Sequence, residues 1–141
     1  MFVIIQLRCC SCGHSSDKFE PLIDMSLEIE HVSTIQQALE SFTMVEKMDG
    51  KFTCSDCNQE VTMEKQLLLD KAPSVAAFHL KRFLKDGDSV KKIDKYVDFS
   101  KELDLKPYTS GSSSDNVSLE FLLHFHTFFQ VFGFKLWFDC G

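Results

Sequence analysis

Two short motifs, RCCSCGHSS at residues 8–16 and FTCSDCNQE at residues 52–60, decide the fold of this chain. Each contains a CxxC turn, which places two sulfurs on one side of a tight knuckle, and two such knuckles together supply a tetrahedral zinc site. Redox chemistry of the thioredoxin type needs only one CxxC, at a strand-to-helix junction. Disulfides or free thiols are the alternative to metal. We predict a structural zinc ion, and its four ligands are Cys9, Cys12, Cys54 and Cys57.

The composition and the first residues of the chain limit its cellular location, the size of its core and its class of partner. Met1 leads directly into FVIIQL without the features of a signal peptide, so we expect an intracellular protein, in the cytoplasm or the nucleus, whose thiols stay reduced. The 141 residues, 44% apolar, suffice for one core. The net charge of −6 argues against nucleic acid as a partner, and the short basic pairs Lys81-Arg82 and Lys91-Lys92 are typical of solvated strand faces.

Hydrophobic patterns predict a mixed α+β chain of mostly antiparallel strands with one clear helix. Residues 2–8 read as a strand that delivers the first knuckle. Residues 22–30 alternate apolar and polar side chains from Ile23 onward, which suits a strand with one buried face. Ser33 and Gln36 fit a capping box for a helix of about ten residues that ends before residue 49. The apolar face of this helix is Ile35, Leu39 and Phe42.

Three further strands are predicted after the second knuckle, at residues 62–70, 74–83 and 90–99. Because Pro73 and Gly87 separate them, we expect these strands to be neighbours in one antiparallel sheet. Residues 110–114 are rich in Gly and Ser and read as a flexible connector. The expected inward side chains of the last strand are Ile93, Val97 and Phe99.

These segments, taken in order, resemble the fingers and palm of the ubiquitin-specific protease (USP) family of deubiquitinating enzymes, over about residues 6–111. The resemblance is carried by SSDKFEPLIDMSLEI, DGKFTCSDC, KAPSVAAFHLKRF and VKKIDKYVDFSKELDLKPYTSG. The first of these segments looks plant-like. The resemblance implies a thumb, palm and fingers fold, with a zinc-ribbon finger at 6–60 and a partial palm at 61–108, both within a partial catalytic domain at 1–111.

The resemblance also implies a function, namely hydrolysis of isopeptide bonds at the C-terminus of ubiquitin by a catalytic Cys and His. Ubiquitin or ubiquitinated proteins would be the partners, and the zinc would fasten the fingertip far from the chemistry. The family's nucleophile lies in an Asn-Thr-Cys-Tyr-like motif and its base in a Gly-His-Tyr motif, and this sequence contains neither. We therefore expect no catalytic residues in the chain and no activity of the chain alone.

Other Cys and His residues are poor substitutes for the missing pair. Cys10 adjoins a metal ligand, so it reads as an extra or alternative ligand or a buried small side chain, and Cys140 has no base at a useful spacing. We interpret the rest as structural or surface histidines, although His14 lies close enough to a knuckle to replace a cysteine ligand. These are His14, His31, His79, His124 and His126.

The end of the chain departs from the family pattern. After a Ser/Gly connector at 112–116, residues 117–141 contain seven of the 14 Phe residues and the single Trp. A membrane span needs about 20 apolar residues, and the polar and charged residues that interrupt this segment argue against one. The other interpretations are a strand that lies on a membrane surface or is exposed and adhesive, and a sequence never selected to close the fold.

Three functions stay open at this point. The chain is part of an active deubiquitinase, or a catalytically dead zinc-ribbon module that binds ubiquitin or another protein, or a fragment without function. The sequence separates the first two only by an absence: without the Cys and His motifs, these 141 residues by themselves should have no hydrolase activity.

Overall fold

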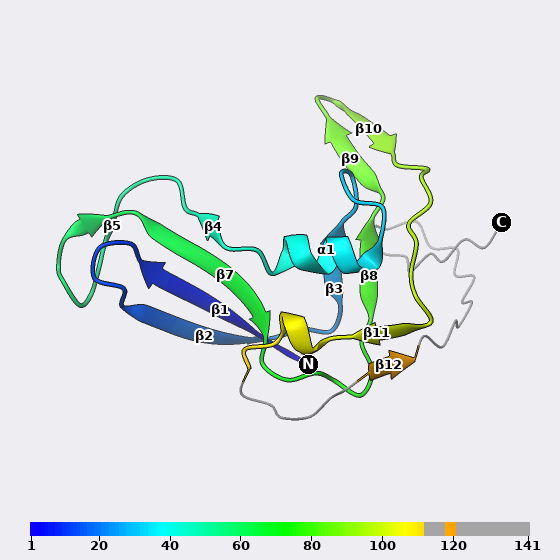
Figure 1. Ribbon diagram of the computed structural model, residues 1–141. Coiled ribbons are helices and arrows are strands. Elements are labelled where there is room, and N and C mark those ends of the chain that lie inside the picture. The colour runs from blue at the N-terminus through cyan, green and yellow to red at the C-terminus, as the bar shows by residue number, and fades with distance from the viewer. Residues whose placement is uncertain (112–117, 121–141) are drawn as a thin grey trace.

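The computed structural model describes residues 1–111 and 118–120. Figure 1 shows an arm of long strands that extends away from a body containing the helix. As predicted, most strand pairs are antiparallel, and the described residues contain one α-helix. The strands and helices in chain order are β1 Phe2–Cys9, β2 Ser15–Pro21, β3 Met25–Glu28, α1 Ile35–Phe42, β4 Glu46–Lys47, β5 Phe52–Thr53, β6 Glu60–Val61, β7 Met63–Leu69, β8 Phe78–Lys81, β9 Phe83–Asp86, β10 Ser89–Lys92, β11 Glu102–Asp104, the 3-10 helix η1 Lys106–Tyr108 and β12 Ser118–Glu120.

The arm is a four-stranded antiparallel sheet in the order β2-β1-β7-β4. Strand β1 lies in the middle, with Val3 opposite Leu69 at the body end and Cys9 opposite Met63 at the far end. The β-branched and apolar residues of β1 suit a strand paired on both sides. The register therefore carries the first knuckle to the tip of the arm, where β5 and β6 form the second hairpin (Figure 1).

The core of the body lies where α1 packs against the parallel pair β3 and β8. Residues 105–108 and the extended segment around Val97 complete it, and Asp98 bonds to the start of the helix. Alternation along β3 turns one side chain in two inward, which is why a four-residue strand contributes two fully buried residues. The buried core residues are Met25, Leu27, Ile29, Ile35, Ala38, Leu39, Leu69, Phe78, Leu80, Val97, Leu103, Leu105 and Tyr108.

Several strand predictions are corrected by the structure. The strands on either side of Pro73 do not share a sheet: β7 belongs to the arm, whereas β8 pairs in parallel with β3. The predicted strand at 90–99 ends at Lys92, although Val97 is buried as expected and Ile93 and Phe99 pack against the core. An antiparallel pair does lie across Gly87, but its first strand is β9, which begins at Phe83, where the predicted strand ends.

Two predicted details near the helix are also wrong. Ile23 is 96% exposed, because the alternation of β3 begins only at Met25. The helix cap is Thr34 rather than Ser33: the Thr34 hydroxyl accepts a hydrogen bond from the backbone N–H of Gln37 at 3.1 Å. The Gln37 side chain accepts in turn from the Ser33 N–H at 2.8 Å, so the Ser33/Gln36 capping box is replaced by a pair of bonds in which Gln37 reaches the residue before the cap.

Among the described residues, none of the helices combines the length and hydropathy needed to cross a bilayer. Most of the Phe-rich segment at 117–141, with His124, His126 and Cys140, lies outside the described residues.

Candidate metal centre

The two knuckles at the tip of the arm are the same turn built twice. The Cys9 N–H donates to the carbonyl of His14 at 2.9 Å, and the Gly13 N–H donates to the carbonyl of Cys9 at 3.0 Å. In the second knuckle, Cys54 donates to the carbonyl of Gln59 at 3.0 Å and Asn58 donates to the carbonyl of Cys54 at 3.0 Å. The first cysteine of each pair is thus held at an equivalent position in an equivalent loop.

This turn requires a left-handed backbone four residues after its first cysteine. Gly13 occupies that position with φ of 75°, and Asn58 occupies its counterpart with φ of 53°. Gly and Asn are the residues that adopt this conformation at least cost. The equivalence was present in the sequence, because Gly13 and Asn58 follow their cysteines at the same spacing, but the CxxC search alone does not reveal it.

The four predicted ligands come together. The sulfur atoms of Cys9, Cys12, Cys54 and Cys57 all lie within 4.8 Å of one another, and those of Cys12 and Cys54 are 3.7 Å apart. A tetrahedron with Zn–S bonds of about 2.3 Å has sulfurs about 3.8 Å apart, so the geometry fits zinc. Four soft thiolate donors leave no coordination position open, which is the pattern of a structural site.

Hydrogen bonds and crowding shift the pKa values of the clustered cysteines in different directions. The backbone N–H groups of Cys12 and Ser11 point at the sulfur of Cys9, and they outweigh burial to lower the pKa of Cys9 to about 6. The backbone N–H of His14 favours the Cys12 thiolate, but desolvation and the three neighbouring cysteines raise the pKa of Cys12 to about 12. The pKa of Cys57 is raised as well: the N–H of Gln59 lowers it, and desolvation with the sulfur of Cys54 outweighs that effect. A dication among the sulfurs would remove this mutual repulsion.

Contacts between the knuckles fix their relative position. The Cys10 N–H donates to the carbonyl of Thr62 at 3.2 Å, and the Ser11 hydroxyl lies 3.3 Å from the Gln59 side-chain oxygen. Beneath the sulfurs, Val61 and Met63 pack against Cys9 and Cys54 to form a small apolar cluster separate from the main core. The tip therefore has little apolar packing of its own, and a metal would supply much of its stability.

The remaining Cys and His candidates in the described residues do not join the group. Cys10 is exposed, so the prediction of a buried side chain is wrong, and neither Cys10 nor the exposed His14 belongs to the four-sulfur group. His31 is exposed, as predicted, and lies 3.6 Å from Glu30. His79 lies on β8, in the body.

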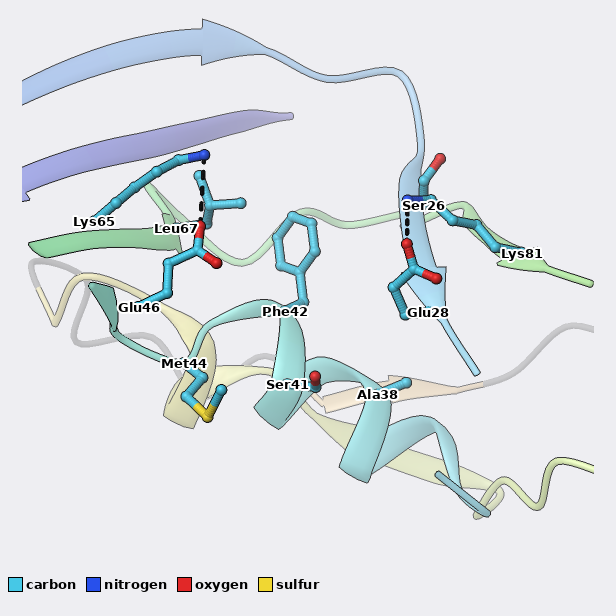
Figure 2. A pocket seen from close by; sticks show the side chains of 10 residues that line it. All are labelled: Ser26, Glu28, Ala38, Ser41, Phe42, Met44, Glu46, Lys65, Leu67 and Lys81. Carbon is cyan, nitrogen blue, oxygen red and sulfur yellow. Dashed lines mark hydrogen bonds and ion pairs between the residues drawn. The ribbon is translucent and has the colours of Figure 1, made fainter. Parts of the chain in front are cut away.

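A second feature lies where the arm meets the body, a hollow of about 320 Å³. Figure 2 shows the ring of Phe42 between two ion pairs, Lys65 with Glu46 at 3.8 Å and Lys81 with Glu28 at 2.6 Å. Sequence reasoning assigned Phe42 to the helix core and did not identify this hollow, because its lining residues come from five separate segments. They are Ser26, Glu28, Ala38, Ser41, Phe42, Met44, Glu46, Lys65, Leu67 and Lys81.

Comparison with known proteins gives a consistent result. The model of the family described as "Ubiquitin carboxyl-terminal hydrolase" matches residues 4–123. Ubiquitin carboxyl-terminal hydrolase 20 of Arabidopsis thaliana is 46% identical over 134 residues, which cover 95% of this chain and 19% of the relative. Ubiquitin carboxyl-terminal hydrolase 21 of the same plant is 46% identical over 129 residues, covering 92% of this chain and 17% of the relative. The chain thus spans about a fifth of the length of these curated relatives.

Among solved structures, the SAGA Ubp8/Sgf11/Sus1/Sgf73 DUB module bound to ubiquitin aldehyde contains a chain that superposes with a TM-score of 0.77 at 29% identity. The superposition covers 84% of this chain and 28% of that chain. The chain belongs to the ubiquitin carboxyl-terminal hydrolase family.

Proposed function

We propose that the chain forms the fingers and part of the palm of a deubiquitinating enzyme. The observation that carries the proposal is the family match over residues 4–123, which includes both knuckles and the body. In this assignment residues 6–60 are the zinc-ribbon finger and residues 61–108 the partial palm. The parent enzyme would hydrolyse isopeptide bonds at the C-terminus of ubiquitin, inside the cell, in the cytoplasm or the nucleus.

The role proposed for the metal is structural. Zinc held by Cys9, Cys12, Cys54 and Cys57 would tie the end of β1 to the β5–β6 hairpin, across a tip with only a small apolar cluster. The chemistry zinc supplies there is four strong bonds to thiolates, with no position left for water or substrate. What the protein contributes is the equivalent turn at each knuckle, which holds the sulfurs at ligand spacing.

The role proposed for the arm and body together is to bind ubiquitin. A chain of similar fold has been solved with ubiquitin aldehyde bound. The hollow between arm and body is a candidate part of the binding surface, because Phe42 and Leu67 supply apolar area while Glu46 and Lys81 supply charged rims (Figure 2). With much of the enzyme's binding surface contributed by other segments, affinity of this chain alone should be weak.

Catalysis would come from other parts of the parent enzyme. The 141 residues contain no Asn-Thr-Cys or Gly-His-Tyr motif, and thiol hydrolysis needs a thiolate with an imidazole within hydrogen-bond reach. The contribution of the chain is therefore to position ubiquitin and to stabilise the fingers.

The test combines metal content with ubiquitin binding on the purified 141-residue chain. Mass spectrometry of metals should find about one zinc per chain, and unlabelled chain added to ¹⁵N-labelled ubiquitin should shift a contiguous set of ubiquitin amide signals. The Cys10→Ser variant is the matched control and should behave as the parent chain. Absence of zinc would overturn the metal assignment, and unchanged ubiquitin spectra at millimolar concentrations of chain would overturn the binding role.

A further inference from the structure

The four cysteines of the candidate metal centre differ sharply in how far each residue is exposed to solvent. Cys9 and Cys54 are buried, at 1% and 0% exposure, whereas Cys12 is exposed and Cys57 is half-buried. Oxidation of cysteine depends on thiolate character and on access. When all four are thiolates around a metal, access decides, and a small oxidant from solvent reaches Cys12 first.

The sulfur poised to react with an oxidised Cys12 lies on the other knuckle. The Sγ atoms of Cys12 and Cys54 are 3.7 Å apart, near van der Waals contact. Within its own knuckle, Cys12 donates its backbone N–H to the sulfur of Cys9 at 3.5 Å. A sulfur that accepts a hydrogen bond is a weaker nucleophile, so Cys9 attacks an oxidised Cys12 less readily than Cys54 does.

We propose that Cys12 and Cys54 are a peroxide-sensitive pair that forms a disulfide across the two knuckles and so releases the metal. The inference rests on the proposed zinc centre and concerns a modification that a structural metal site does not by itself require. Its specific content is the choice of partners: one cysteine from each knuckle, and neither the Cys9–Cys12 nor the Cys54–Cys57 pair.

The chemistry balances with hydrogen peroxide as the oxidant. The Cys12 thiolate attacks one peroxide oxygen, the O–O bond breaks, and Cys12 becomes a sulfenic acid as hydroxide leaves. The Cys54 thiolate then attacks the Cys12 sulfur, an S–S bond forms, and the second hydroxide leaves. Two electrons pass from sulfur to peroxide, and two protons from solvent convert the hydroxides to water. Cys9 and Cys57 alone then bind zinc much more weakly than four thiolates.

The choice of partners decides what happens to the arm. A bond between Cys12 and Cys54 keeps the end of β1 tied to the β5–β6 hairpin, as the metal did, and it closes a long loop of the chain. A bond within either CxxC would leave the two knuckles unconnected. The proposed product is therefore a metal-free arm whose tip stays closed.

Tryptic peptides distinguish these products directly. Cleavage after Arg8 and Lys18 places the first knuckle in peptide 9–18, and cleavage after Lys51 and Lys65 places the second in peptide 52–65. A disulfide across the knuckles links the two peptides, and a disulfide within a knuckle does not. The full chain carrying Cys10→Ser and Cys140→Ser retains only the four cluster cysteines and removes competing thiols.

The experiment treats this zinc-loaded chain with hydrogen peroxide, alkylates the remaining thiols and digests it without reduction. We expect linked 9–18 and 52–65 peptides with alkyl groups on Cys9 and Cys57, and release of about one zinc per linked pair, measured with a chromogenic chelator. Bridges within a CxxC, linkage through Cys9, or sulfinic and sulfonic acids as the main products would overturn the proposal.

Zinc content before oxidation separates the two possible failures. A chain that contains no zinc at the start contradicts the proposed metal centre. A chain that holds one zinc and yields other oxidation products leaves that centre intact and contradicts the Cys12–Cys54 pair alone. The chain with all six cysteines, treated in parallel, should give the same linked peptides.

Discussion

The backbone N–H of Cys12 lies 3.5 Å from the sulfur of Cys9 and donates a hydrogen bond to it. With a second N–H from Ser11, this contact holds the pKa of Cys9 at about 6, while the pKa of Cys12 rises to about 12 and that of Cys57 is also raised. At neutral pH the metal-free chain thus holds Cys9 as a thiolate and keeps Cys12 and Cys57 protonated. Metal binding must displace those protons.

The first prediction is a count of released protons. Zinc binding at pH 7.5 should release two or more protons, because Cys12 and Cys57 both ionise on ligation. As pH falls through about 6, Cys9 also becomes protonated without metal, and the count should rise by one. Zinc affinity should therefore fall by at least about 100-fold for each unit of decreasing pH near neutrality. Calorimetry in buffers of different ionisation enthalpy measures the count, and a value below two would contradict the assignment.

The second prediction concerns Cys12→Ser. Loss of one thiolate should reduce bound zinc from about one per chain to nearly none and unfold the tip of the arm, because metal binding is folding free energy in small metal knuckles. Metal analysis and amide hydrogen exchange of residues 9–14 and 54–61 check this. Cys10→Ser changes the adjacent, exposed cysteine outside the cluster and should leave both readouts unchanged. Full zinc content in the Cys12→Ser chain would count against a four-thiolate site.

The third prediction is an absence of hydrolysis by the isolated chain. The purified 141 residues should release no fluorophore from a ubiquitin C-terminal amide, because no Cys and His motif of the family is present. Release of fluorophore by the chain would contradict this expectation. Activity that persists in the double variant Cys54→Ala and Cys57→Ala would also place the chemistry outside the second knuckle.

Local chemistry made the grouping of the four cysteines predictable from sequence. Two CxxC motifs specify ligand type and spacing, and strand β1 reads directly from its β-branched residues into the first of them. The arm depends on pairings that sequence does not display. Strand β2 was not predicted, because SSDKFEP is polar and exposed along most of its length and gains its structure from pairing with β1.

The strand pairing of the body was harder to predict from sequence, for a related reason. Sequence neighbours usually pair, so β7 and β8 were placed in one sheet. The structure instead pairs β8 with β3, with Phe78 opposite Met25 in parallel register, because both strands must bury one face against the same helix. Contacts between segments so far apart in the chain depend on the completed core, and no local pattern records them.

The fourth prediction tests that core. Leu39 of α1 is fully buried among residues of the body, so Leu39→Ala should lower the free energy of unfolding by about 2–5 kcal/mol. Ile23, which is 96% exposed, provides the control, and Ile23→Ala should change stability by less than about 0.5 kcal/mol. Urea denaturation with zinc in excess measures both. Equal effects of the two substitutions would contradict the packing of α1 on the β3–β8 pair.

The fifth prediction decides between two adjacent helix caps. The Thr34 hydroxyl accepts from the Gln37 N–H, so Thr34→Ala leaves that N–H without its acceptor and should cost about 1 kcal/mol of stability. Ser33 contributes only its backbone N–H to Gln37, which Ser33→Ala retains, so this substitution should cost less than about 0.5 kcal/mol. The same denaturation experiment compares them. A larger loss for Ser33→Ala would restore the cap indicated by the sequence pattern and shift the start of α1 by one residue, whereas the expected order places the cap at Thr34, between the two residues whose backbones bond to Asp98, Ser33 and Ile35.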